Sequence, residues 1–139
     1  MKREDIIKDF VQRDRLAQHL GIEVYDVGDG SAKGRMKVSE FHLNSAGTVH
    51  GGAIFALADA VFSAASNSHG TLAMAINVSI SYFKAGREGT LFAEAREVSV
   101  NPKLGTYLIS IKDDKGQEVA LFQGTVYRKS TPLEDVIEG

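Results

Sequence analysis

The most regular pattern of apolar and polar positions runs from Leu72 to Tyr82. Every second residue there is apolar, and the residues between are small or polar. A period of two is typical of a β-strand. Looser alternation, bounded by turns rich in Gly, Asn, Asp or Pro, predicts five further strands. These are expected at residues 22–27, 31–39, 90–100, 104–112 and 118–128.

Two segments have helical spacing instead. Residues 5–19 place apolar side chains at helical intervals between charges, and Gly21 suits the left-handed end of such a helix. Residues 53–66 are apolar on nearly every side, with many alanines, which is typical of a buried helix. The polar residues 130–139 are expected to form a flexible tail.

The predicted order is one helix, two strands, a buried helix and four strands. It favours an α+β fold in which an antiparallel sheet wraps around one central helix, with an extra N-terminal helix and a single domain over residues 1–139. One helix cannot cover a six-stranded sheet fully. Self-association through a strand edge or a sheet face is therefore expected.

Composition narrows the possible partners and the cellular setting. The 139 residues carry a net charge of −2, which gives no electrostatic reason to expect nucleic acid or an anionic membrane as a partner. The absence of cysteine excludes disulfides and thiolate metal sites and suits the cytoplasm. The charged opening residues predict no secretory signal, and no apolar run reaches the roughly 18 residues of a membrane span.

Gly51 and Gly52 open the central helix. Glycine costs up to about 1 kcal/mol in a helix relative to alanine, so a pair requires a reason. The first N–H groups of a helix have no internal partner and lie at the positive end of its dipole. A bare backbone lets a carbonyl oxygen that gains negative charge approach these donors. Alternatively, the two glycines only form a tight turn.

Asp59 is the only acidic or basic residue, histidines aside, between Phe41 and Phe83. A carboxylate in so apolar a helix is costly unless it is paired, and Arg96 or Lys84 from a neighbouring strand would be a structural partner. Otherwise it suits a general base or a nucleophile.

The spacing between Gly51 and Asp59 is also informative. Eight residues correspond to about 12 Å along a helix, too far for both groups to reach one carbonyl carbon. Two such helices running antiparallel across a twofold axis would bring Gly51 of one chain to Asp59 of the other. The spacing therefore favours a dimer with two shared sites.

His50 and Asn44 flank this segment on its N-terminal side. His50 is expected to cap the helix or to orient a ligand, and Asn44 to shape a loop or to orient a water or a carbonyl group. The other histidines, His19, His42 and His69, are expected to be surface or core residues. Motifs for phosphate loops, dinucleotides, zinc proteases and serine nucleophiles are absent, and no metal is expected.

The run Asn44-x-x-Gly47-x-x-His50-Gly51-Gly52, followed by Phe55 and Leu57-Ala58-Asp59, resembles the signature of hotdog-fold acyl-CoA thioesterases. The phenylacetate-degradation branch of that superfamily is the most similar. The resemblance extends from residues 19–22 to 122–128, and Ser81-Tyr82-Phe83 also resembles a strand of the family.

The resemblance implies a dimer that often doubles to a homotetramer, and thioester hydrolysis without a cofactor. Carried over by position, the Gly51 N–H polarises the thioester carbonyl and Asp59 of the partner chain attacks it or activates water. Asn44 and His50 then position the reacting group. Some relatives have a serine where this chain has Ala75; Asn77 and Ser63 are candidates to substitute for it in positioning the water.

The remaining candidates concern the substrate. Gly52 lies beside the carbonyl site, and apolar residues are expected to line an acyl pocket. Basic residues in turns are candidates for the coenzyme A phosphates. The acyl candidates are Ile54, Phe55, Phe62 and Phe83; the basic candidates are Lys84, Arg87 and Lys103.

Three functions fit these residues. The leading hypothesis is a thioesterase for aromatic or medium-chain acyl-CoA. A non-catalytic acyl-CoA sensor is the alternative, although the presence of Asp59 argues against it. A hotdog dehydratase or isomerase matches less well, because it would need a catalytic histidine with a carboxylate placed differently.

Overall fold

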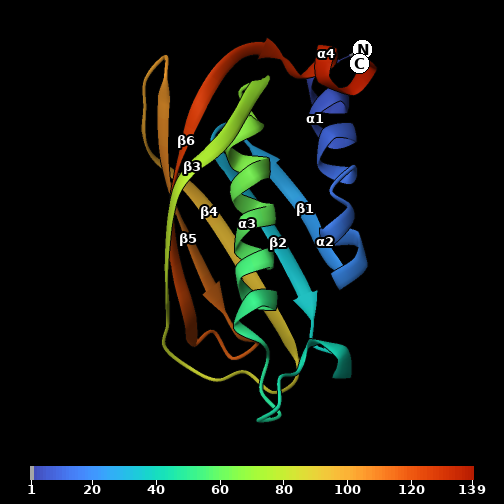
Figure 1. The fold of residues 1–139 in the computed structure, drawn as a ribbon, viewed down its shortest axis with the longest axis vertical. Helices are drawn as coiled ribbons and strands as arrows, with labels where there is room; N and C mark the ends of the chain where they lie inside the picture. Colours follow the sequence, from blue (N-terminus) through green and yellow to red (C-terminus); the bar gives the residue numbers. More distant parts are fainter. Residues whose placement is uncertain (1) are drawn as a thin grey trace.

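A computed structural model describes residues 2–139 as one sheet packed around a long helix (Figure 1). The strands follow the order β1-β2-β4-β5-β6-β3, and every neighbouring pair is antiparallel. The strands are β1 Ile22–Gly28, β2 Ser31–Lys37, β3 Thr71–Tyr82, β4 Thr90–Val100, β5 Leu104–Lys112 and β6 Glu118–Pro132. The helices are α1 Arg3–Gln12, α2 Arg15–Leu20, α3 Gly51–Asn67 and α4 Leu133–Glu138, with a 3₁₀ turn at Glu40–His42.

The predicted fold is confirmed. Helix α3 lies across one face of the sheet, and α1 and α2 lie beside it on the β1 side (Figure 1). Strands β1 and β3 form the two edges of the sheet. The regular alternation of residues 72–82 thus belongs to an edge strand.

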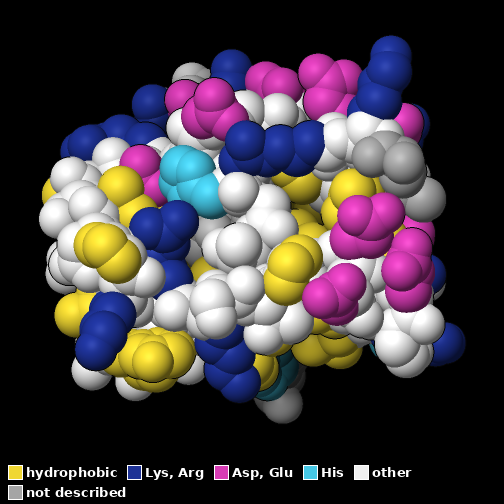
Figure 2. Space-filling model, turned by 90° about the horizontal axis from the view of Figure 1, so that it is seen from above, with side chains coloured by type: hydrophobic (Ala, Val, Ile, Leu, Met, Phe, Trp, Pro, Cys, Tyr) yellow, Lys and Arg dark blue, Asp and Glu magenta, His cyan; other side chains and the backbone are white. Residues whose placement is uncertain are grey.

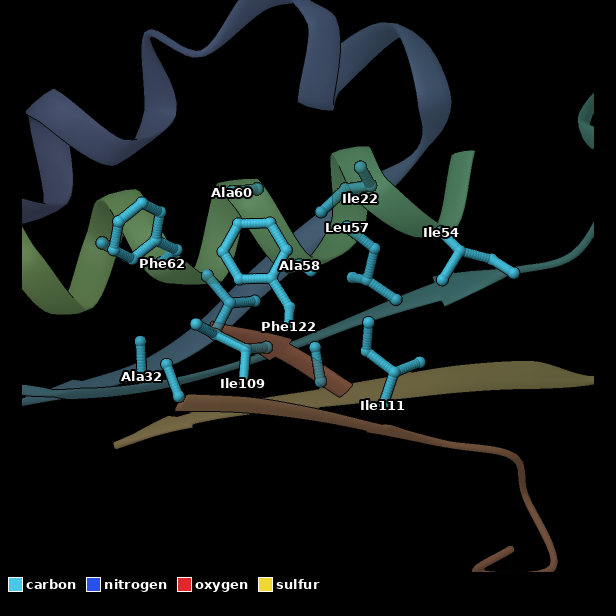
Figure 3. Packing of buried hydrophobic residues seen from close by; sticks show 14 of the residues in the cluster. Ile22, Ala32, Ile54, Leu57, Ala58, Ala60, Phe62, Ile109, Ile111 and Phe122 are labelled. Atoms are coloured by element: carbon cyan, nitrogen blue, oxygen red, sulfur yellow. The ribbon is translucent and has the colours of Figure 1, made fainter. Parts of the chain in front are cut away.

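The core lies between α3 and the sheet (Figure 3). The Phe62 ring of α3 packs against the rings of Phe122 and Tyr107, with centroids 5.4 and 5.9 Å apart. Gly124 of β6 lies directly under Phe62, and a Cβ there would come within 2.6 Å of the ring. The absence of a side chain at Gly124 therefore allows the helix to approach the sheet closely.

The prediction of one helix over residues 5–19 is wrong. The chain forms two helices, because Asp14 caps a new one: its carboxylate accepts a hydrogen bond from Ala17 N–H at 3.0 Å. The left-handed end at Gly21 is confirmed by its φ of 73°.

The predicted strand over residues 31–39 ends at Lys37. His42 turns the chain there, because its Nδ1 accepts from Ser39 N–H at 3.0 Å and its Nε2 lies 2.7 Å from the Leu20 carbonyl oxygen. His42 is buried, as expected for a core histidine.

The prediction of a flexible tail over residues 130–139 is also wrong. Strand β6 continues to Pro132, and the rest of the chain forms α4. Leu133 and Ile137 are buried, and Leu133 N–H donates to the Gly70 carbonyl oxygen at 3.0 Å. Helix α4 packs beside α1, so the two ends of the chain lie together (Figure 1). Burial of these two apolar side chains is thus enough to fix the segment as a helix, although most of its residues are polar.

Figure 2 shows the end of the molecule that carries α4. Acidic and basic side chains are mixed over it, with hydrophobic ones exposed between them. Within residues 2–139, no helix combines the length and apolar character needed to cross a membrane.

Candidate active site

The N-terminus of α3 has one open donor. His50 caps the helix, since its Nδ1 accepts from Gly52 N–H at 2.9 Å and its carbonyl oxygen accepts from Ala53 and Ile54. The cap expected of His50 is thus confirmed. Throughout residues 2–139, no acceptor is found for the Gly51 N–H. This donor lies at the positive end of the helix dipole, where it favours an oxygen carrying negative charge.

Tyr82, the last residue of β3, contacts the first residue of α3 through its side chain. Its hydroxyl donates to the Gly51 carbonyl oxygen at 2.9 Å. A Cβ on Gly51 would lie 3.2 Å from that hydroxyl oxygen, so the glycine makes room for the tyrosine. Burial raises the pKa of Tyr82 and keeps the donor protonated. Sequence reasoning assigned Tyr82 no role in the site, since no local pattern distinguishes it from an ordinary strand residue.

Asp59 lies half-buried in the middle of α3. No hydrogen bond or ion pair to its carboxylate occurs within the described part of the chain. The alternative in which Lys84 or Arg96 pairs with Asp59 is not found: Lys84 Nζ lies 2.6 Å from Asp113 Oδ2, and Arg96 forms no ion pair with Asp59. Burial raises the pKa of Asp59, and repulsion from the Asp14 carboxylate raises it further. An unpaired, partly desolvated carboxylate has the properties of a base or a nucleophile.

A pocket of about 220 Å³ surrounds Asp59. Phe10 of α1, Phe62, Ser63 and Ser66 of α3, Val126 of β6 and residues 72–75 of β3 line it. Asp59 thus faces the beginning of β3, at the free edge of the sheet.

A single chain does not bring Gly51 and Asp59 together. Both belong to α3, separated by eight residues or about 12 Å. Gly51 lies beside the end of β3 at Tyr82, whereas Asp59 lies beside its beginning.

The Asn44 side chain is engaged within its own loop. Its Oδ1 accepts from Ala46 N–H at 2.9 Å and from Thr48 N–H at 3.2 Å. This confirms the loop-shaping interpretation. A contact of Asn44 with substrate stays a prediction.

The expected substrate residues fall into two groups. Phe55 is half-buried against Phe122, with ring centroids 5.3 Å apart, while Gly52, Phe83 and Lys84 lie near the N-terminus of α3. Lys103 lies at the opposite end of the sheet, where its carbonyl oxygen accepts from Arg128 N–H at 2.7 Å. Strand β3 spans about 36 Å between these ends, so one chain cannot gather Lys84 and Lys103 at one ligand. Asn77 is exposed between them on β3.

Comparisons with known proteins show to which family the chain belongs. Residues 46–120 match the model of the thioesterase superfamily. A putative esterase of Archaeoglobus fulgidus is 48% identical over 124 residues, which are 88% of this chain and 80% of the relative. The Escherichia coli acyl-coenzyme A thioesterase PaaI is 36% identical, over 84% of each chain.

Solved structures agree with this assignment. The structure of the Escherichia coli PaaI protein superposes with a TM-score of 0.89 and 31% identity, covering 94% of this chain and 95% of that one. A Streptococcus mutans protein solved with bound acetyl-CoA has a TM-score of 0.76 and 27% identity, covering 80% and 90%.

The fold and these comparisons together define a hotdog-fold thioester hydrolase. The chain belongs to the thioesterase superfamily, and the sequence-based assignment to this family is confirmed.

Proposed function

We propose that this protein hydrolyses the thioester of an acyl-CoA, either aromatic, such as a phenylacetyl derivative, or medium-chain, to a free acid and coenzyme A. The observation that carries the proposal is that α3 holds both a donor and a carboxylate, Gly51 N–H and Asp59, for which residues 2–139 supply no hydrogen-bond partner. Acyl-CoA as the substrate class is supported by the Escherichia coli thioesterase and by the acetyl-CoA bound to the Streptococcus mutans protein.

In the proposed reaction, the thioester carbonyl oxygen accepts a hydrogen bond from Gly51 N–H. Asp59 of a second subunit removes a proton from water, and the water oxygen bonds to the carbonyl carbon. The carbon–sulfur bond then breaks, and the coenzyme A thiolate takes up a proton. Alternatively, an Asp59 oxygen attacks the carbon directly, and water hydrolyses the resulting anhydride. In both routes the negative charge develops on the carbonyl oxygen, beside the helix dipole.

A dimer through β3 would complete this site. Within residues 2–139, the outer edge of β3 has no neighbouring strand. Antiparallel pairing of two β3 strands across a twofold axis would satisfy the free backbone N–H and C=O groups of this edge and set two α3 helices antiparallel. The beginning of one β3, with Asp59, would then lie near the end of the other, with Gly51 and Tyr82. Pairing of two dimers into a tetramer and a cytoplasmic location stay predictions.

His50 and Asn44 are proposed to position the reacting group, and Gly52 to leave room for it. Phe55, Phe83 and Asn77 are proposed to contact the acyl part or its linker. Because Lys84 is already paired with Asp113, its contribution to binding coenzyme A phosphates requires that it exchange this partner. Lys103 of one subunit would reach the opposite end of a neighbouring chain only in the antiparallel dimer.

The experiment that tests the function measures release of coenzyme A from phenylacetyl, hydroxyphenylacetyl, benzoyl and straight-chain thioesters, with Asp59→Asn beside the wild type. Hydrolysis that depends on Asp59 supports the proposal. If no thioester is cleaved while calorimetry still detects binding, the protein is a sensor and the proposed hydrolysis is wrong.

A further inference from the structure

The pocket around Asp59 adjoins a larger cavity. This second cavity measures about 690 Å³ and lies between α1 and α2 on one side and α3, β1 and α4 on the other. Phe10 and Ser63 line both spaces. Phe10, half-buried on α1, therefore stands at the boundary between the two.

The lining of the larger cavity suits an apolar chain. Its apolar residues are Phe10, Val11, Ala17, Ile22, Val24, Ala60, Ala64, Val136 and Ile137. Ala60 lies on the side of α3 turned toward α1 and α2 (Figure 3). No bulky side chain of α3 fills the space there, because the helix contributes only Ala60, Ser63 and Ala64.

The charged residues beside this cavity are already engaged. The Arg13 guanidinium lies 3.1 Å from the Asp9 carboxylate, and the Asp14 carboxylate caps α2. Glu23 interacts with the Arg35 guanidinium at 2.5 Å. A charged ligand would have to displace these partners, whereas a hydrocarbon chain would not.

The two volumes differ in what they accommodate. Small-molecule sites usually measure roughly 300–1,000 Å³. The pocket beside Asp59, at about 220 Å³, falls below that range and suits a compact acyl group. The larger cavity, at about 690 Å³, falls within it and has room for an extended chain.

We propose that the cavity between α1–α2 and α3 is a subsite for the distal part of a straight-chain acyl group, and that Phe10 determines how far the chain extends from Asp59. This rests on the proposed function, because it places the acyl group beside Asp59. With Phe10 present, a phenylacetyl-sized group fills the first pocket, and a longer chain reaches the cavity only by passing the Phe10 ring. Without the ring, the chain continues along the alanines of α3.

The test measures binding rather than turnover, with coenzyme A thioethers that cannot be hydrolysed. Calorimetry on the whole protein compares S-phenylethyl-, S-octyl- and S-dodecyl-coenzyme A for the wild type and for Phe10→Ala. We expect Phe10→Ala to bind the dodecyl thioether about tenfold more tightly than the wild type does, as for two further methylenes buried. Its affinity for the phenylethyl thioether should stay within about twofold.

Two controls separate an opened subsite from a loosened helix. Ile7→Ala removes a buried side chain from the same helix, but Ile7 lines neither of the two cavities. It should leave chain-length preference unchanged. Val136 lines only the larger cavity and is 37% exposed, so Phe10→Ala combined with Val136→Trp should fill the space and abolish the gain.

The subsite is refuted if Phe10→Ala leaves the ratio of dodecyl to phenylethyl affinities unchanged, or if Ile7→Ala changes it equally. Persistence of the gain in the double variant would also overturn it. Because binding is measured without hydrolysis, these results are independent of the thioesterase assay. If the wild type hydrolyses thioesters but Phe10→Ala leaves the ratio of dodecyl to phenylethyl affinities unchanged, the proposed function stands and only the subsite is rejected.

Discussion

Asp59→Asn is expected to lower turnover and raise stability at the same time. Asparagine keeps the size of the side chain and removes its charge. The carboxylate is half-buried in an apolar helix, has no hydrogen-bond partner within residues 2–139, and is repelled by the Asp14 carboxylate. The charged carboxylate therefore lowers the stability of the folded state, and removing its charge should raise the free energy of unfolding.

The size of the stability gain follows from this environment. Asparagine stays polar, so the gain comes only from removing the charge, which costs more to bury than a neutral polar group of the same size. Because Asp59 is only partly shielded from water, this difference should be modest, about 1 kcal/mol. For a domain of 139 residues this corresponds to a rise in Tm of about 3–4 °C.

The gain should depend on pH in a defined direction. The pKa of Asp59 is raised in the folded chain, so the folded state binds the proton more readily than the unfolded state. Protonation therefore stabilises the wild type fully below the unfolded pKa near 3.8, and this stabilisation is lost as pH rises through the folded pKa. The advantage of Asp59→Asn should be present at neutral pH and shrink as the medium becomes acidic.

Calorimetric or circular-dichroism melts at several pH values measure this difference. Asp26→Asn is the matched control: Asp26 is exposed on β1, and the variant loses the same charge with no expected change in Tm. In parallel, turnover should fall by about 10²-fold or more, equivalent to about 2.7 kcal/mol of transition-state stabilisation. An Asp59→Asn protein that is less stable at neutral pH, or as active as the wild type, would refute the reasoning.

Two further outcomes are expected. Mixing Asp59→Ala with Gly51→Val chains, each inactive alone, should restore about a quarter of wild-type activity, because half of the randomly formed dimers are mixed and each mixed dimer has one intact site of two. No recovery in mixed dimers shown to form would contradict a shared site. Deleting Leu133–Glu138 should lower stability by several kcal/mol, on the order of 2–5, because buried Leu133 and Ile137 are lost; an unchanged melting curve would contradict the packing of α4.

The predicted strands were nearly correct because their signal is local. Alternation and turn residues placed β4 and β5 at their observed bounds, and glycine placed the end of α2. The errors in helix boundaries arose where one or two side chains decide the local structure against the overall pattern of the segment. Asp14 capped a second helix within a continuous helical pattern, and two apolar residues anchored α4 in a polar segment.

The site was predicted only as far as residue type and spacing allow. The glycine pair, His50 and Asp59 stand out in the sequence because each is costly or unusual in an apolar helix. Tyr82 did not, because a tyrosine that ends an alternating strand fits the strand pattern by itself. Its hydrogen bond to Gly51 joins residues 31 positions apart in the chain.

The sequence by itself determined the six strands, the central helix, the family and the spacing of eight residues between the donor and the carboxylate, since these depend on periodicity and spacing along one element. Only the tertiary structure decided that Asp59 has no partner among residues 2–139, that Lys84 pairs with Asp113, and that Phe10 lines two cavities. These features depend on which side chains meet across the sheet and helices. Such meetings follow from packing in three dimensions, which no local pattern along the chain encodes.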